Sequence, residues 1–303
     1  MEMNAAEKDK QVLDQLVAWG AAREDVRAMV LTSSRTNPTA PVDAFSDYDV
    51  IVAVNDIRPY FQDRGWLEDF GRVLVLYRDP IQRLNGVEKF AYITQYEDGL
   101  KIDFTLIHPE YLCGLAAAPV LPPDLEPGYI VLLDKDRLTR GMAAPSHRAY
   151  IPMPPTESEY LEGIEIFFHE ATYLAKYLWR DDLLPARHHL DISLKEDHLL
   201  PMMEWLVEIE QGWPVKTGHW GRGLKKWLRR ELWAELEGTY AGAGLEENWA
   251  AMFRTIDLFQ KVAQEVGQAL GFEYPLALHE RAVRYLCRVR DLDRNAQVAS
   301  FQE

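Results

Sequence analysis

Three aspartates stand where they could hold metal ions. Asp47 and Asp49 lie one residue apart at the start of the β-forming run "YDVIVAV" (48–54), and Asp103 lies among apolar residues in "LKIDFTLI" (100–107). Alternate residues of a strand point to the same face, so the first two carboxylates project together. Close carboxylates repel each other unless a cation sits between them, and Mg²⁺ prefers oxygen ligands. If the two strands are neighbours, the three carboxylates predict a site for Mg²⁺, with two ions expected, and for transfer of a phosphoryl or nucleotidyl group.

The segment before these aspartates strengthens this interpretation. An Asp-x-Asp pair at a strand end is often only part of a turn. Here the predicted strand "VRAMVLTSS" (26–34) ends in Ser33 and Ser34, about a dozen residues before the pair. A serine turn that leads into a helix N-terminus offers backbone N–H groups and hydroxyls to a phosphate. The full order is a strand, a serine turn, an Asp pair and a later third Asp. This order is rarer than an Asp pair alone, so it favours a metal site over a simple turn.

Composition narrows the class of protein. The chain has 303 residues, 48% apolar and 27% charged, which is enough for two globular domains. Its net charge of −15 disfavours nucleic acid as a partner and attracts cations. Cys113 and Cys287 are the two cysteines, without a CxxC or Cys/His cluster, so we expect a cytoplasmic protein without structural zinc. The N-terminus has no apolar signal-peptide core, and residues 8–19 predict an amphipathic helix. No apolar run is long enough to span a membrane, so we expect no membrane partner.

The pattern of apolar residues predicts an α+β fold. Further strands are expected over 72–77, 90–96, 100–107 and 129–134, and the hairpin signal "EDG" at 97–99 joins the strands at 90–96 and 100–107. Beyond a Pro-rich segment the pattern becomes helical, and Thr156 with Glu159 forms a capping-box spacing. Helices are expected over 156–183, 194–213, 223–237, 247–271 and 275–293. We therefore predict domains at 1–140 and 157–303, joined by a linker at 141–156.

These motifs resemble the signature of the nucleotidyltransferase superfamily, which is Gly-Ser, a gap, Asp-x-Asp and a later carboxylate. Nearly the whole chain is similar to the aminoglycoside 6-adenylyltransferases, or streptomycin adenylyltransferases. The resemblance implies a nucleotidyltransferase-like mixed β-sheet that binds ATP and Mg²⁺, followed by an all-α helical bundle that binds the substrate. The segments that carry it are "SSRTNPTAPVDAFSDYDV" (33–50), "KIDFTLI" (101–107), "VLLDKD" (131–136), "EIFFHEATYLAKYLWRDDLLPAR" (165–187) and "MEWLVEIEQGWPVKTGHWGRGLKKWL" (203–228).

The resemblance also implies residue roles. Asp47 and Asp49 match the metal-binding pair, and Asp103 matches the third carboxylate. Ser34 and Arg35 match a Gly-Ser-Arg turn, which implies contacts with the nucleotide phosphates. The family glycine is Ser33 here, so we expect either a less close approach to the phosphate or a different backbone dihedral. The implied reaction transfers AMP from ATP to the 6-hydroxyl of streptomycin and releases pyrophosphate.

Several candidates keep two interpretations. The general base is Asp103, Asp181 or Asp182, while the last two are equally explained as solvated charges at a helix end. Lys176 either extends to solvent or reaches the triphosphate, and Lys225 either belongs to a solvated helix face or binds phosphate.

The function also keeps alternatives. The acceptor is streptomycin, another aminoglycoside, a protein or an RNA, and the acidic balance disfavours RNA. A nucleotide-binding regulator without turnover is the remaining alternative. We expect a monomer or a weak dimer.

Overall fold

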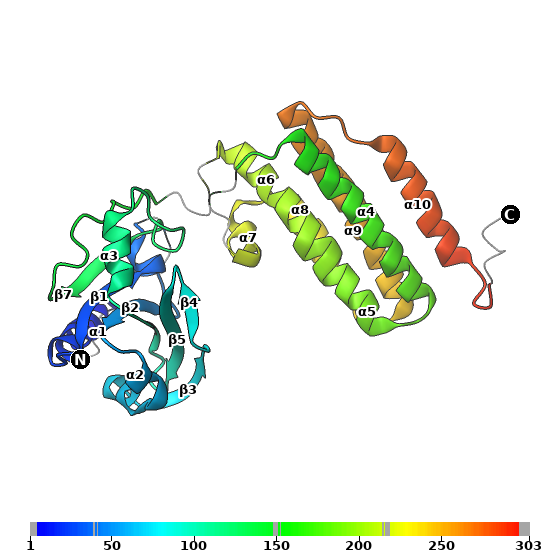
Figure 1. Ribbon diagram of the computed structural model, residues 1–303. Helices are drawn as coiled ribbons and strands as arrows, with labels where there is room; N and C mark the ends of the chain where they lie inside the picture. Colours follow the sequence, from blue (N-terminus) through cyan, green and yellow to red (C-terminus); the bar gives the residue numbers. More distant parts are fainter. Residues whose placement is uncertain are drawn as a thin grey trace. The chain divides into compact units, whose positions relative to one another are not determined.

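The computed structural model describes residues 5–38, 40, 42–147, 151, 153–213, 215 and 219–296. The chain forms two compact units, Met1–Ala149 and Tyr150–Glu303 (Figure 1). Part of the predicted linker, at 148–150 and 152, lies outside the described residues. Within the described part of the chain, no helix combines the length and the apolar character needed to cross a membrane.

The first unit is built on one seven-stranded sheet. Six strands follow the order β3-β5-β6-β2-β1-β7, and the seventh, β4, pairs with β5. The neighbours β2 and β6 are parallel, and the other pairings are antiparallel. The sheet is therefore mixed, as expected. The strands are β1 (Val26–Thr32), β2 (Tyr48–Val54), β3 (Val73–Arg78), β4 (Gln82–Leu84), β5 (Val87–Tyr96), β6 (Lys101–Ile107) and β7 (Tyr129–Asp134).

Both faces of this sheet are covered, and side-chain alternation decides which residues go where. Val50, Val52 and Phe104 lie on the face that packs against α1 (Ala5–Ala21), α2 (Arg58–Gln62) and the 3₁₀ helix η2 (Gly65–Phe70). The opposite face, with Ile51 and Ile107, packs against α3 (Glu110–Ala117). Asp49 and Asp103 share the parity of this second face, but they lie near the starts of their strands, ahead of its apolar cluster.

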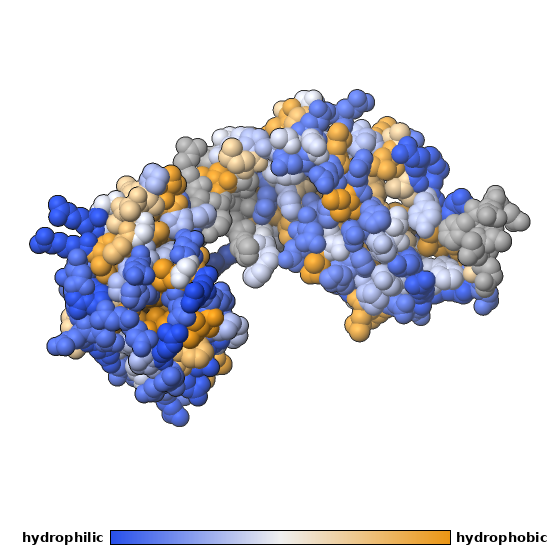
Figure 2. All heavy atoms as spheres, in the orientation of Figure 1, coloured by the Kyte–Doolittle hydropathy of each residue, from blue (hydrophilic) through white to orange (hydrophobic). Residues whose placement is uncertain are grey.

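The second unit is all-helical. Phe167 of α4 stacks on Phe259 of α9 with ring centroids 3.7 Å apart, and the Tyr160 hydroxyl donates to the Ala263 carbonyl at 2.8 Å. Hydrophilic residues cover most of the surface in the view of Figure 2, so the apolar residues lie mainly inside. The helices are α4 (Glu157–Trp179), α5 (Leu183–His188), the π-helix η3 (His189–Leu199), α6 (Leu200–Gln211), the 3₁₀ helix η4 (His219–Gly221), α7 (Leu224–Trp227), α8 (Arg230–Glu237), α9 (Leu245–Leu270) and α10 (Leu276–Asp291).

Most predicted elements form, and the exceptions have local causes. The capping box of Thr156 and Glu159 is present, and β5 and β6 form the predicted hairpin. The short strand β4 was missed, although Asn85-Gly86, with φ of 51° and 84°, is a typical hairpin turn.

The helix predicted over 223–237 is wrong because the chain extends at Leu228 and Arg229. This break turns the Arg229 guanidinium toward Glu210 on α6, at 3.1 Å, and Glu265 on α9.

Candidate metal and nucleotide site

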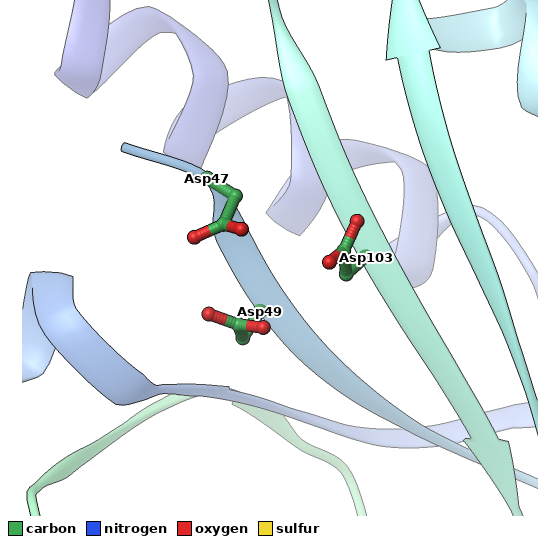
Figure 3. Close-up of side chains that lie close together, drawn as sticks. All are labelled: Asp47, Asp49 and Asp103. Atoms are coloured by element: carbon green, nitrogen blue, oxygen red, sulfur yellow. The ribbon is translucent and has the colours of Figure 1, made fainter. Parts of the chain in front are cut away.

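The aspartates are brought together by the pairing of β2 and β6. In this parallel pair Tyr48 is level with Ile102 and Asp49 is level with Asp103. Asp47 precedes β2 by one residue, so it has the same parity as Asp49. The three carboxylates consequently point into one space from two neighbouring strands (Figure 3). One oxygen of each can be chosen so that all three lie within 4.8 Å of one another.

A lysine that sequence reasoning did not single out completes this cluster. Lys101, the first residue of β6, places its ammonium 2.6 Å from Asp47 Oδ2 and 3.0 Å from Asp103 Oδ2. The lysine and Asp103 are two residues apart on one strand and therefore face the same side. The parity of "KID" alone was a signal for this contact, but its partner Asp47 lies on a different strand.

The electrostatics of the cluster favour a bound cation. Burial, followed by the charges of Asp47 and Asp103, raises the pKa of the Asp49 carboxyl to about 6, although a hydrogen bond from the Ser33 side chain and the charge of Lys101 act in the opposite direction. Burial also raises the pKa of Asp103, although the Lys101 ammonium opposes this shift. Carboxylates whose pKa is raised by burial and by like charges gain most from a cation at the shared space.

The donor set fits a hard divalent cation. All three side chains offer oxygen, the donor that Mg²⁺ prefers. Asp103 Oδ1 is buried and has no hydrogen-bond partner within the described residues. A buried oxygen without a partner is costly unless a ligand satisfies it. These residues therefore fit a Mg²⁺ ion.

The raised pKa of Asp49 predicts an acid limb in the pH profile. If the three aspartates bind Mg²⁺ for transfer from ATP, as the resemblance implies, Asp49 must lose its proton before it can bind metal, so kcat/KM for ATP at low Mg²⁺ is expected to fall below about pH 6. A profile from about pH 5 to 8.5 measures it.

A Ser33→Ala variant, which lacks the hydroxyl that stabilises the charged form, should shift this limb to higher pH. A profile that stays flat down to pH 5 in the unmodified protein would contradict the assignment.

Comparison with known proteins identifies the chain. The family model described as streptomycin adenylyltransferase matches residues 6–289. The chain belongs to the streptomycin adenylyltransferase family. It is 30% identical to an aminoglycoside 6-adenylyltransferase of Bacillus subtilis (strain 168), over 88% of this chain and 93% of that protein. It is 31% identical to the aminoglycoside 6-adenylyltransferase of Campylobacter jejuni, over 92% and 95% of the two chains. A crystal structure of an aminoglycoside 6-adenyltransferase from Bacillus subtilis aligns at 26% identity and a TM-score of 0.46, covering 93% of this chain and 98% of that chain.

This streptomycin adenylyltransferase-family chain is therefore an adenylyltransferase.

Its serine turn shows how the departure from the family's glycine is accommodated. Ser33 begins the 3₁₀ helix η1 (Ser33–Thr36) with a φ of 68°, the left-handed region that favours glycine. This conformation ends β1 at Thr32, two residues earlier than predicted. Ser33 thus adopts a backbone conformation that glycine adopts without strain, and both expected consequences of the missing glycine stay predictions.

A second residue keeps this turn in place. A Cβ at Gly128, whose φ is 148°, would collide with the Thr36 carbonyl oxygen. The residue that follows Gly128 begins β7, which pairs with β1. Glycine is thus required where β7 passes the serine turn, and this contact was not predictable from local sequence.

Arg35 has a structural set of partners. Its guanidinium donates to the backbone carbonyls of Ser46 (2.7 Å) and Asp47 (2.8 Å), pairs with Asp9 Oδ1 at 2.7 Å and lies 3.7 Å above the Tyr48 ring. Its side chain is only 13% exposed. The arginine therefore fixes the backbone that carries Asp47. A contact with the nucleotide phosphates, which the resemblance implied for Ser34 and Arg35, stays a prediction.

The remaining candidates lie in the helical unit. Asp181 and Asp182 are exposed between α4 and α5, and Asp181 has a φ of 60°. Lys176 lies over the rings of Tyr173 and Tyr177, with its nitrogen 4.1 and 4.5 Å from their centroids. Their roles as base and as phosphate ligand stay predictions. Lys225, 70% exposed, is 3.7 Å from a carboxylate oxygen of Glu237 and lies over Trp233, and its role as a phosphate ligand likewise stays a prediction.

Proposed function

We propose that this protein transfers AMP from ATP to a hydroxyl of an aminoglycoside, with the 6-hydroxyl of streptomycin as the acceptor. The observation that carries the proposal is the convergence of Asp47, Asp49 and Asp103 from two parallel strands in an adenylyltransferase-family chain. Two relatives, both named aminoglycoside 6-adenylyltransferase, supply the acceptor class.

In this proposal, separate residues bind the metal, bind the phosphates and accept the proton. Asp47, Asp49 and Asp103 would hold Mg²⁺, which when bound supplies positive charge to the triphosphate and to the departing pyrophosphate. Backbone N–H groups and hydroxyls of the turn at Ser33 and Ser34 lie at the start of η1, where they can bind phosphate oxygens. Asp103, Asp181 and Asp182 remain the candidates to accept the proton of the acceptor hydroxyl.

Charge supports a cationic acceptor. The net charge of −15 attracts polycations and speeds their encounter with the protein. The helical unit also has a pocket of about 320 Å³ with three carboxylates and the 75% exposed Trp220 on its lining. The acidic lining residues are Glu196, Asp197 and Glu204. Carboxylates beside an indole face suit an aminated sugar better than an anionic nucleic acid.

The test is pyrophosphate release from MgATP by the purified full chain, with and without streptomycin. We expect release that depends on streptomycin, together with a product whose NMR spectrum places the adenylyl group on the 6-hydroxyl. Release with a different aminoglycoside alone would keep the reaction and change the acceptor.

Other outcomes favour the alternatives. Release with protein or RNA but with no aminoglycoside would reject the acceptor class. Tight ATP binding without release on any acceptor would favour a nucleotide-binding regulator.

Both cysteines, Cys113 and Cys287, are free thiols. This agrees with the proposed cytoplasmic setting, where ATP is available and thiols stay reduced.

A further inference from the structure

Lys101 occupies a position that a metal ion would need. Its ammonium contacts one oxygen of Asp47 at 2.6 Å and one oxygen of Asp103 at 3.0 Å. Those two carboxylates belong to the predicted metal site, and they come from neighbouring strands. The ammonium therefore bridges β2 and β6 at the point where the carboxylates would otherwise repel each other.

The contact is ordered but not sealed from water. The side chains of Lys101, Asp47 and Asp103 are 31%, 30% and 19% exposed. Ion pairs with this exposure have modest net strength, so the ammonium can leave without unfolding the strands. A four-carbon stem with rotatable bonds allows the charged group to swing while the backbone of β6 stays paired.

An ammonium and a divalent cation cannot share these oxygens fully. Mg²⁺ needs its oxygen ligands at about 2.0–2.1 Å, which is far closer than a lysine nitrogen approaches, and it repels a positive charge at the same place. Lys101 acts on the Asp49 carboxylate only as a more distant charge, which lowers the pKa of that carboxyl. The competition thus concerns Asp47 and Asp103.

We propose that Lys101 is a tethered counter-cation, which holds Asp47 and Asp103 in place in the metal-free protein and must leave them when metal binds. The inference rests on the part of the proposed function that assigns metal to the three aspartates. Lys101 is a positioning residue in this account. It keeps the carboxylates converged before metal arrives, and it weakens the binding of metal that comes without nucleotide.

The nucleotide supplies the reason why displacement is favourable during catalysis. A displaced ammonium beside a triphosphate gains new anionic oxygens, whereas an ammonium displaced by metal alone gains only water. Metal and ATP should therefore bind with positive coupling, and part of that coupling should be lost without Lys101.

The experiment measures Mn²⁺ binding by electron paramagnetic resonance, without nucleotide, in the full chain and in Lys101→Met. Removal of the competing ammonium should tighten Mn²⁺ binding about tenfold. The variant should unfold at a lower temperature in EDTA, because the carboxylates lose their counter-cation, and should recover or exceed the unmodified protein in saturating Mn²⁺. Lys89→Met removes the same charge at the other end of the β5–β6 pair and should leave Mn²⁺ binding unchanged.

Each remaining outcome is decisive. Weaker or unchanged Mn²⁺ binding in Lys101→Met, or an equal drop in melting temperature with and without Mn²⁺, would overturn the counter-cation role. Lys101→Gln repeats the test with a polar side chain if the Met variant does not fold. A failure of the proposed function gives a different result. If the three aspartates do not bind metal, Asp49→Asn will leave the Mn²⁺ binding of the protein unchanged.

Discussion

Replacing Asp49 with asparagine should abolish adenylyl transfer and yet make the metal-free protein more stable. The loss of one ligand from the metal site is expected to lower kcat by at least about 1,000-fold. The gain in stability follows from the pKa of about 6 in the folded protein, above the ordinary value of 3.8. The folded state holds this proton more tightly than the unfolded state does, so stability is lost as pH rises from about 4 to 6.

Above pH 6 that loss is complete, and a neutral asparagine removes it. We expect the free energy of unfolding in EDTA at pH 7.5 to rise by about 1–2 kcal/mol, and the melting temperature by about 2–4 °C per kcal/mol. Differential scanning fluorimetry in EDTA and pyrophosphate release in Mg²⁺ measure the two effects. Asp14→Asn, on the exposed face of α1, is the matched control and should change neither. A destabilised Asp49→Asn protein, or one that keeps a tenth of the activity, would show that Asp49 does not have this role.

Replacing Arg35 with methionine should damage both stability and catalysis. The variant leaves the carbonyls of Ser46 and Asp47 without their donor, and it removes one of the two donors to Asp9 Oδ1, which keeps the Tyr48 hydroxyl; the expected cost is about 2–3 kcal/mol. Because the same contacts fix the backbone of Asp47, we expect kcat/KM to fall about 100-fold through misplacement of this carboxylate.

The measurements are urea unfolding in EDTA, and kcat/KM and KM for ATP. Arg35→Lys keeps the charge but loses the planar guanidinium. If Arg35 fixes the backbone at Asp47, the Lys variant should behave like Arg35→Met in both assays. If Arg35 instead binds a nucleotide phosphate, Lys should preserve much of the ATP affinity, and stability should hardly change. Arg64→Met, at an exposed position, controls for the removal of one charge.

The sequence by itself determined the features that depend on neighbours along the chain. The parity of Asp47 and Asp49, the capping box at Thr156 and the "EDG" hairpin all follow from periodicity or turn chemistry within a few residues. The same local patterns predicted a β-rich first half and a helical second half. The family resemblance is also a property of the sequence, because it depends on the order of residue types in short segments spread over the whole chain.

Only the tertiary structure decided which strand lies beside β2. The parallel pairing places Asp103 level with Asp49, 54 positions away. It also brings Lys101 between Asp103 on its own strand and Asp47, a partner that the residues around Lys101 do not reveal. It also turned Arg35 inward. Strand order and register are set by burial of both faces of the sheet, an energy summed over residues far apart in sequence, and no local pattern records that sum.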